Sequence, residues 1–429
     1  MEKKIPYLSQ VAQYPSRIKL FWSSIGPGIV TGAADDDPSG IGTYTVAGAQ
    51  FGTAFLWSAL LTWPLMAMVQ MACARIGMVT GEGLASALER KFPRFILIIF
   101  CLALFFANTL NVGADLAAMA DAAEMLGGGS SHLYVIIFGA LIAWATVKLR
   151  YFHIARILKW LALFLFSYII AAFIVGPNWS EALHNTFIPS WPNSKEQWSM
   201  LVAILGTTIS PYLFFWQASQ EVEEEKAAGR STVPQRSGAT EKEISTRRYD
   251  VGIGTFFSNI VMYFIILAAA LTLNRHGLTT IETSKQAAEA LVPIAGRFAS
   301  LLYTIGLLGV GFLAIPTLTG SAAYALAETF GWDQGLDAPL FKARAFYGVI
   351  IISTLAGIAF DFSDINPIKA LYLSAVVNGM LAPFLLIGIF LVMKDKVIMK
   401  GQPSSALSQV GVGLCALLMI GAAIGMFLF

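Results

Sequence analysis

The chain has 429 residues, of which 56% are hydrophobic and 13% charged, and its mean hydropathy of +0.68 exceeds what a soluble domain of this size needs to fill its core. These values predict an all-α polytopic membrane protein that lies in a lipid bilayer. The net charge of +2 gives no indication of a nucleic-acid partner. The three cysteines are isolated, so neither a disulfide framework nor a zinc site is expected.

The chain begins with a polar segment, residues 1–21, which has no short apolar core with a cleavage site behind it and is therefore expected to be a cytoplasmic N-terminal segment. Eleven apolar runs follow that are long enough to cross a hydrocarbon core of about 30 Å. They are 22–50 and 199–220, both interrupted, and 54–76, 95–125, 133–150, 154–176, 251–273, 297–327, 342–360, 368–393 and 407–429.

The distribution of basic residues predicts the orientation of these spans. Most of the 28 Lys and Arg residues fall in segments that share one side of the membrane if the N-terminus is inside. We therefore expect a multi-pass protein of the plasma (inner) membrane, with the N-terminus cytoplasmic and the C-terminus outside. The polar stretch 220–250 has mixed charges and few aromatics, which is typical of a flexible cytoplasmic loop.

Two of the spans are interrupted near their middle. In the first, the stretch "GAADDDPSGIG" (32–42) places Asp37 about fifteen residues after the entry near Trp22, roughly 22 Å along a helix axis. In the sixth, Ser210 and Pro211 lie about eleven residues after Ser199, and a proline there breaks the helix because it cannot donate to the hydrogen-bond ladder.

The spacing of the two breaks predicts an internal repeat. The broken spans are separated by a set of five, and an odd number of crossings turns the second set upside down relative to the first. Paired interrupted spans in two inverted halves mark the central site of a secondary transporter. We expect a first repeat over 22–176, an inverted second repeat over 199–393 and an eleventh helix over 407–429.

The break in the first span has the chemistry of a cation site. Carbonyls that end the first half of the helix, near Ala34, lose their partners and carry partial negative charge, and Asp37 adds a full charge. Oxygen donors alone suit hard or borderline divalent cations. Asp37 before a proline is also a good helix N-cap. Asp35 and Asp36 are either further ligands or residues hydrated in a vestibule.

Several motifs resemble those of the Nramp divalent metal transporters. "GPGIVTGAADDDPSGIGTYTVAGAQFG" (26–52) resembles the first span of that family, and "ARIGMVTGEGLA", "ADLAAMA", "INPIKALYLS" and "LAPF" resemble its later landmarks in the same order. The resemblance implies a LeuT-type fold of eleven transmembrane helices, with an inverted 5+5 repeat and unwound first and sixth helices. It also implies transport by alternating access.

The resemblance further implies which residues hold the metal. Asp37 matches the family's aspartate, Ala34 its first-span carbonyl and Thr207 its sixth-span carbonyl, whereas Gly40 stands in place of its asparagine and Ser210 in place of its methionine. Loss of the thioether removes the ligand that favours transition metals, and loss of the amide is expected to open space. A roomier, all-oxygen site would accept Mg²⁺ with part of its water shell.

Proton coupling is expected to be impaired. Of the positions that carry protons in the family, Asp115 is retained, but Ala118 replaces a glutamate, and Tyr212 and Gln217 replace histidines. Groups that titrate near neutral pH are what a proton relay needs. The chain therefore resembles the Nramp-related magnesium transporters, and we expect uncoupled transport of Mg²⁺ and Mn²⁺. A proton-coupled Mn²⁺/Fe²⁺ importer is the alternative.

Two further questions stay open at the level of the sequence. Asn378 stands near a glutamine of the family that approaches the metal, but it could equally form an interhelical hydrogen bond. The rival functions are a sodium-coupled organic-solute carrier of LeuT fold, against which the three aspartates argue, and a sensor that binds a cation without carrying it. No catalytic motif, cofactor site or obligate protein partner is evident, so the chain is not expected to be an enzyme.

Overall fold

The computed structural model describes residues 27–148, 163–363 and 365–429, and within these ranges the chain is helical, with connecting loops and no strand. The α-helices are α2 Pro27–Asp35, α3 Pro38–Phe51, α4 Leu56–Thr80, α5 Leu84–Glu89, α6 Arg94–Gly127, α7 Ser131–Lys148, α9 Phe166–Val175, α10 Trp179–Phe187, α11 Lys195–Thr208, α12 Pro211–Ala227, α13 Val233–Arg236, α14 Glu241–Thr272, α15 Ser284–Ala288, α16 Val292–Ala295, α17 Ala299–Phe330, α18 Arg344–Phe360, α19 Pro367–Met393 and α20 Ala406–Leu428. Short 3₁₀ turns join several of them: η1 Leu163–Leu165, η2 Asn274–His276, η3 Glu289–Leu291, η4 Gly296–Phe298 and η5 Asp361–Ser363.

Most of the predicted spans appear as long helices. Within the described ranges, nine helical segments are long and apolar enough to cross a membrane, α11 with α12 counting as one of them. The pair α2 and α3 forms the interrupted first span, and α9 ends the fifth. The predicted N-terminal segment, 1–21, lies outside the described residues, and so does part of the predicted fifth span, 154–176.

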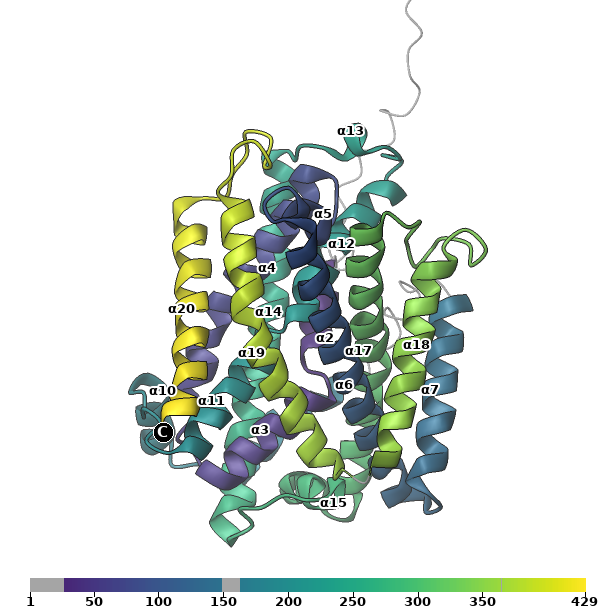
Figure 1. Cartoon of the computed structure of the whole chain (residues 1–429). Coiled ribbons are helices and arrows are strands. Elements are labelled where there is room, and N and C mark those ends of the chain that lie inside the picture. Colours follow the sequence, from purple (N-terminus) through teal and green to yellow (C-terminus); the bar gives the residue numbers. More distant parts are fainter. Residues whose placement is uncertain (1–26, 149–162, 364) are drawn as a thin grey trace, which may run out of the picture.

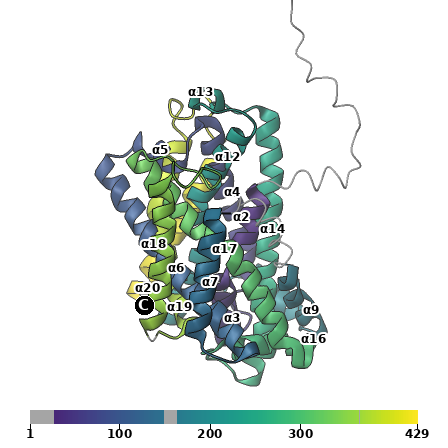
Figure 2. The ribbon, with the colours of Figure 1, turned by 90° about the vertical axis from the view of Figure 1, so that its right-hand side faces the viewer.

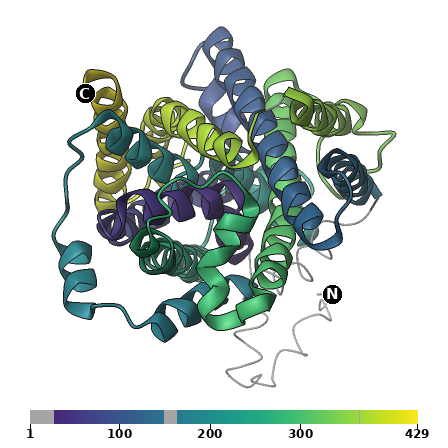
Figure 3. The ribbon, with the colours of Figure 1, turned by 90° about the horizontal axis from the view of Figure 1, so that it is seen from below.

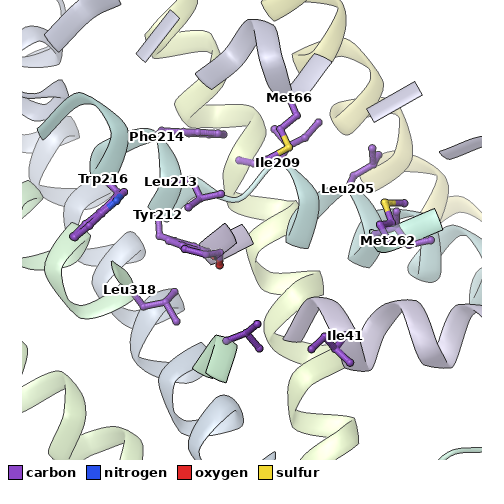
Figure 4. Packing of buried hydrophobic residues seen from close by; sticks show 14 of the residues in the cluster. Ile41, Met66, Leu205, Ile209, Tyr212, Leu213, Phe214, Trp216, Met262 and Leu318 are labelled. Atoms are coloured by element: carbon purple, nitrogen blue, oxygen red, sulfur yellow. The ribbon is translucent and has the colours of Figure 1, made fainter. Parts of the chain in front are cut away.

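The long helices stand side by side in a bundle with the broken spans at its centre (Figure 1). In the most apolar stretch of the sixth span 89% of the residues are buried, compared with 22% in α7, which lies at the edge of the bundle. Around the break of this span, Ile209, Leu213 and Phe214 belong to the buried apolar cluster, and Met66 of α4 lies beside Ile209 (Figure 4). The polar break is therefore surrounded by tightly packed apolar side chains.

Both predicted breaks are present. α2 ends at Asp35 and α3 begins at Pro38, while α11 ends at Thr208 and α12 begins at Pro211. Each second half begins with a proline, which suits the first helical position because it has no N–H to satisfy. Seen from below, α3 crosses the centre of the bundle among the other core helices (Figure 3).

Glycines allow the central helices to approach each other at backbone distance. A Cβ added at Gly206 of α11 would lie 2.2 Å from the backbone N of Gly379 in α19. A Cβ at Gly32 of α2 would lie 2.5 Å from the carbonyl of Gly254 in α14, and these two helices lie side by side (Figure 2). Small residues at helix crossings are typical of membrane proteins. These contacts hold the first half of each broken span, α2 and α11, against a neighbouring helix.

The prediction of a flexible loop over 220–250 was wrong. α12 continues to Ala227, α13 occupies Val233–Arg236, and α14 begins at Glu241, behind a capping box in which Thr240 and Glu243 bond each other's backbone N–H. The buried charges of this stretch, Glu221, Arg247 and Asp250, pair with one another across α12 and α14, as described below, and so do not depend on water.

Candidate cation site

Asp37 lies at the break of the first span and is 1% exposed. It is the N-cap of α3: its Oδ1 accepts hydrogen bonds from the Gly40 N–H at 2.7 Å and from the Ser39 hydroxyl at 2.9 Å. Its second oxygen, Oδ2, faces two side chains from other helices. The N-cap expected from the Asp-Pro pair is therefore present, and it uses only one of the two carboxylate oxygens.

Asn111 of α6 is a site residue that the sequence reasoning missed. Its amide Nδ2 donates to Asp37 Oδ2 at 3.1 Å and to Asp115 Oδ2 at 3.2 Å, so that one amide group joins the two buried carboxylates. Asn111 and Asp115 are four residues apart on one helix, a spacing that places both side chains on the same face. That spacing was the signal in the sequence that could have found Asn111.

The carbonyl that ends α2 is also engaged. The hydroxyl of Tyr212, at the start of α12, donates to the Ala34 carbonyl oxygen at 2.9 Å and lies 3.4 Å from Asp37 Oδ2. Tyr212 is fully buried. The structure therefore brings together three of the predicted site residues, Ala34, Asp37 and Tyr212, and links them to Asp115 through Asn111.

Thr207 and Ser210 line the break of the sixth span. The Ser210 hydroxyl donates to the carbonyls of Gly206 at 2.8 Å and of Thr207 at 2.7 Å, which are released where α11 ends. The Thr207 hydroxyl reaches across to within 3.4 Å of the Ser39 hydroxyl in α3. Oxygen atoms from both broken spans therefore face each other across the centre of the bundle.

The extra space expected beside Gly40 is not there. A Cβ added at Gly40 would lie 3.3 Å from the Thr207 hydroxyl oxygen and 3.4 Å from both the Asp35 carbonyl oxygen and the ring of Tyr44. Neighbouring groups occupy the space that a longer side chain would need. The position is therefore narrow in this closed arrangement.

Asp35 and Asp36 point toward α14. The Ser258 hydroxyl is 2.6 Å from Asp35 Oδ2 and 3.2 Å from Asp36 Oδ1, and both carboxylates are at most 5% exposed. An isolated carboxylate at such depth is costly, because hydrocarbon cannot replace its hydration. The predicted ligand Asp36 thus lies beside the break, with its described contact to Ser258 and not to Asp37.

The other predicted positions are dispersed. Asn378 is buried on α19, next to the Gly206–Gly379 contact, and within the described structure its Oδ1 has no hydrogen-bond partner. Ala118 is buried in α6. Gln217 lies in α12 and donates from Nε2 to Glu221 Oε1 at 2.7 Å, away from Asp37.

A buried ion cluster closes one end of the central helices. Arg247 of α14 binds Glu221 of α12 at 2.7 Å, Asp250 at 2.6 Å, and Glu224. Asp250 Oδ2 also accepts the Gly28 backbone N–H at 2.7 Å, at the first turn of α2. A carboxylate at a helix N-terminus is favourable, because it satisfies an otherwise free N–H and complements the helix dipole. The cluster therefore ties α12 and α14 to the beginning of α2.

A cavity lies at each end of the bundle. At the α13 end, a cavity of about 480 Å³ is lined by Glu221, Glu225 and Arg230. At the α15 end, a cavity of about 520 Å³ is lined by Gln50 and Glu196, among others. Asp37 lies between these ends and is almost without exposed surface, so the centre is closed toward both sides.

The donor set of the centre consists of oxygens. Among the residues that the structure describes, no three His, Cys, Asp or Glu side chains are grouped to hold a metal ion. A cation at the break would be held by Asp37, by backbone carbonyls such as that of Ala34, by hydroxyls and by retained water. Such a set suits a hard cation that keeps part of its hydration shell.

The chain is similar to known proteins over nearly its whole length. The family model "Nramp: Natural resistance-associated macrophage protein-like" matches residues 28–429. The divalent metal cation transporter MntH of Caldanaerobacter subterraneus is 27% identical, over 94% of this chain and 92% of the relative. MntH of Mycobacterium leprae is 24% identical, over 86% and 83%.

Solved structures share the fold. A crystal structure of the Eremococcus coleocola manganese transporter, in complex with an aromatic bis-isothiourea substituted compound, matches with a TM-score of 0.72 at 18% identity, over 96% of this chain and 87% of that chain. MhsT in complex with L-phenylalanine matches with a TM-score of 0.60 at 15% identity, over 97% and 99%. The predicted LeuT-type fold is thereby confirmed.

Proposed function

Because the chain belongs to the Nramp family, whose model matches almost its whole length, we propose that it carries divalent metal cations across a membrane by alternating access. The observation that carries the proposal is that Asp37 Oδ2 and the Ala34 carbonyl oxygen both lie within reach of the Tyr212 hydroxyl, at the broken centre of the bundle, which is closed toward both ends. Relatives described as divalent metal cation transporters, and one as a manganese transporter, support the cargo.

We further propose that the cargo includes Mg²⁺ as well as Mn²⁺. Ser210 and Gly40 leave the centre without the thioether and the amide that the family pattern has at these positions. Oxygen donors discriminate poorly between these two cations, whereas sulfur would favour the transition metal. The narrow space beside Gly40 means that a hydrated ion would require the two broken spans to separate slightly from the closed arrangement.

Uncoupled transport is the second part of the proposal. Tyr212 and Gln217 are engaged as hydrogen-bond donors to Ala34 and Glu221, and neither side chain titrates near neutral pH. Ala118 carries no proton. Asp115 alone keeps its carboxylate, joined to Asp37 through Asn111. This pair is the observation that favours the alternative, a proton-coupled Mn²⁺/Fe²⁺ importer.

The proposed orientation follows from the basic residues. Lys226, Arg230 and Arg236 gather at the α13 end, which we assign to the cytoplasm of a cell with this protein in its plasma (inner) membrane. The N-terminus would then be cytoplasmic and the C-terminus outside. The cavity beside Gln50 and Glu196 would be the outer entrance.

Ion uptake into proteoliposomes tests the proposal. The purified protein is reconstituted, and uptake of Mg²⁺, Mn²⁺ and Ca²⁺ is compared while the internal pH is recorded. We expect Mg²⁺ and Mn²⁺ uptake without acidification, and loss of uptake in a folded Asp37→Ala variant. Acidification driven by Mn²⁺ without Mg²⁺ flux would support the proton-coupled alternative, and uptake of an organic solute driven by Na⁺ would support a carrier of another class.

A further inference from the structure

Tyr212 contacts both of the groups that would bind the ion under the proposed function. Its hydroxyl lies 2.9 Å from the Ala34 carbonyl oxygen and 3.4 Å from Asp37 Oδ2. Within the described residues these are the only two acceptors within reach of that hydroxyl. The ring is fully buried beside Leu213, and Figure 4 shows its hydroxyl oxygen in red. The phenol is therefore held by the two oxygens and by apolar packing.

Of the two carboxylate oxygens of Asp37, Oδ2 is the one that can turn to an ion. Oδ1 accepts the Gly40 N–H and the Ser39 hydroxyl, and these bonds cap α3. Oδ2 accepts only from side chains of other helices, Asn111 and Tyr212. A cation that used both Asp37 Oδ2 and the Ala34 carbonyl at roughly 2.0–2.6 Å from each would lie beside the Tyr212 hydroxyl.

A phenol hydroxyl has one hydrogen, and here that hydrogen points at the oxygens that would face the ion. Its positive end and a divalent cation repel each other at such a distance. We propose that Tyr212 takes the place of the cation in the empty carrier, by satisfying the end of α2, and that it competes with the cation for the Ala34 carbonyl and Asp37. Tyr212 is thus a positioning residue that sets cation affinity, and the inference rests on the proposed function.

The competition explains why the empty centre can close. Without an ion, the Ala34 carbonyl would be buried at the end of a half-helix with no partner, which is unfavourable in the absence of water. The hydroxyl removes that penalty from the empty state only, so it stabilises the carrier without cargo relative to the carrier with cargo. Removing it should destabilise the empty state and tighten cation binding.

Titration of Mn²⁺ into purified full-length Tyr212→Phe and wild-type protein tests the inference by calorimetry. Phe keeps the ring and removes the hydroxyl, so the Kd for Mn²⁺ should fall roughly two- to tenfold, the equivalent of one hydrogen bond. Tyr324→Phe is the matched control, because Tyr324 is equally buried in α17 and its hydroxyl accepts the Leu336 N–H, far from Asp37 in the sequence. This control should leave the Kd unchanged.

A second readout separates affinity from stability. The rise in Tm on adding saturating Mn²⁺ should be larger for Tyr212→Phe than for wild type, whereas a merely structural hydroxyl would lower Tm equally with and without the ion. Tyr212→Leu, which also lacks the hydroxyl, should change the Kd in the same direction and serves if Phe does not fold. An unchanged or higher Kd in these variants overturns the inference, and a higher Kd would make the phenol oxygen a ligand. A wild-type protein that binds neither Mn²⁺ nor Mg²⁺ overturns the proposed function itself.

Discussion

Replacing Arg247 by Met should destabilise the protein by about 3–5 kcal/mol, the usual cost of leaving buried carboxylates without their partner. Arg247 is the cation of a cluster whose carboxylates Glu221 and Asp250 have side chains only 2% exposed, at 2.7 and 2.6 Å. Glu224 is 38% exposed and can turn to water, so it adds little. Met keeps the apolar length of the side chain, so the loss measures the charge and not the packing.

The measurement is the free energy of unfolding in mixed micelles, from SDS titrations followed by circular dichroism. Arg230→Met is the matched control: Arg230 also binds glutamates, at 2.6 and 3.7 Å, but its side chain is 36% exposed, so the loss should stay below about 1 kcal/mol. The loss in Arg247→Met should shrink in acid, because protonation removes the unpaired charges. Equal losses in the two variants would refute the argument that burial makes the Arg247 cluster essential.

Three further outcomes are expected. Asn111→Leu should raise the KM for Mn²⁺ uptake about tenfold, because the Asn111 amide joins Asp37 to Asp115 and so fixes the orientation of the Asp37 carboxylate. Asn108→Leu, one turn away and bonded to α17, should leave KM unchanged, and equal KM values in the two variants would remove Asn111 from the site. Gly206→Ala should lower the free energy of unfolding by about 1–3 kcal/mol, because the added Cβ would lie 2.2 Å from the backbone of α19. Gly421→Ala is the control: it has open space around it and should be tolerated when both variants are unfolded by SDS titration. A hydrogen bond from Lys91 and two backbone N–H groups lower the pKa of Asp395 from 3.8 to about 2. The contribution of Asp395 to stability should therefore be present above about pH 4 and disappear as the pH falls through 2. Curves of Tm against pH for wild type and Asp395→Asn should converge in acid, and parallel curves would contradict this.

Within the described residues, the sequence was sufficient to predict most of the long helices and both breaks. Hydropathy located the long helices. The Asp37-Pro38 and Ser210-Pro211 pairs located the interruptions, because a capping residue followed by a proline suits the start of a new helix, whereas Pro64, Pro316 and Pro383 lie inside α4, α17 and α19. These are local effects, which a linear pattern records. The assignment of Asp37 as an N-cap followed from the same local chemistry.

Contacts between distant segments could not be predicted in the same way. The 220–250 stretch looked like a solvated loop because the linear pattern assigns no partners to its charges. The buried ion pair of this stretch joins Glu221 and Arg247, which are 26 residues apart in the sequence. The room beside Gly40 depends on Thr207, which reaches it only in the folded bundle. The hydroxyl of Tyr212 on the end of α2 is likewise a contact between segments almost two hundred positions apart. Hydrophobic periodicity carries no information about such pairs.

The contact of α14 with the first half of the broken first span repeats every four residues, at Gly28 with Asp250, at Gly32 with Gly254 and, just beyond the end of α2, at Asp36 with Ser258. Two of these contacts are hydrogen bonds, and the middle one joins backbone to backbone with no room for a side chain. A hinge that swings α2 alone would have to open this whole seam at once. We therefore expect α2 and α14 to tilt together as one rigid unit. Sliding would then take place where this unit packs against the other helices.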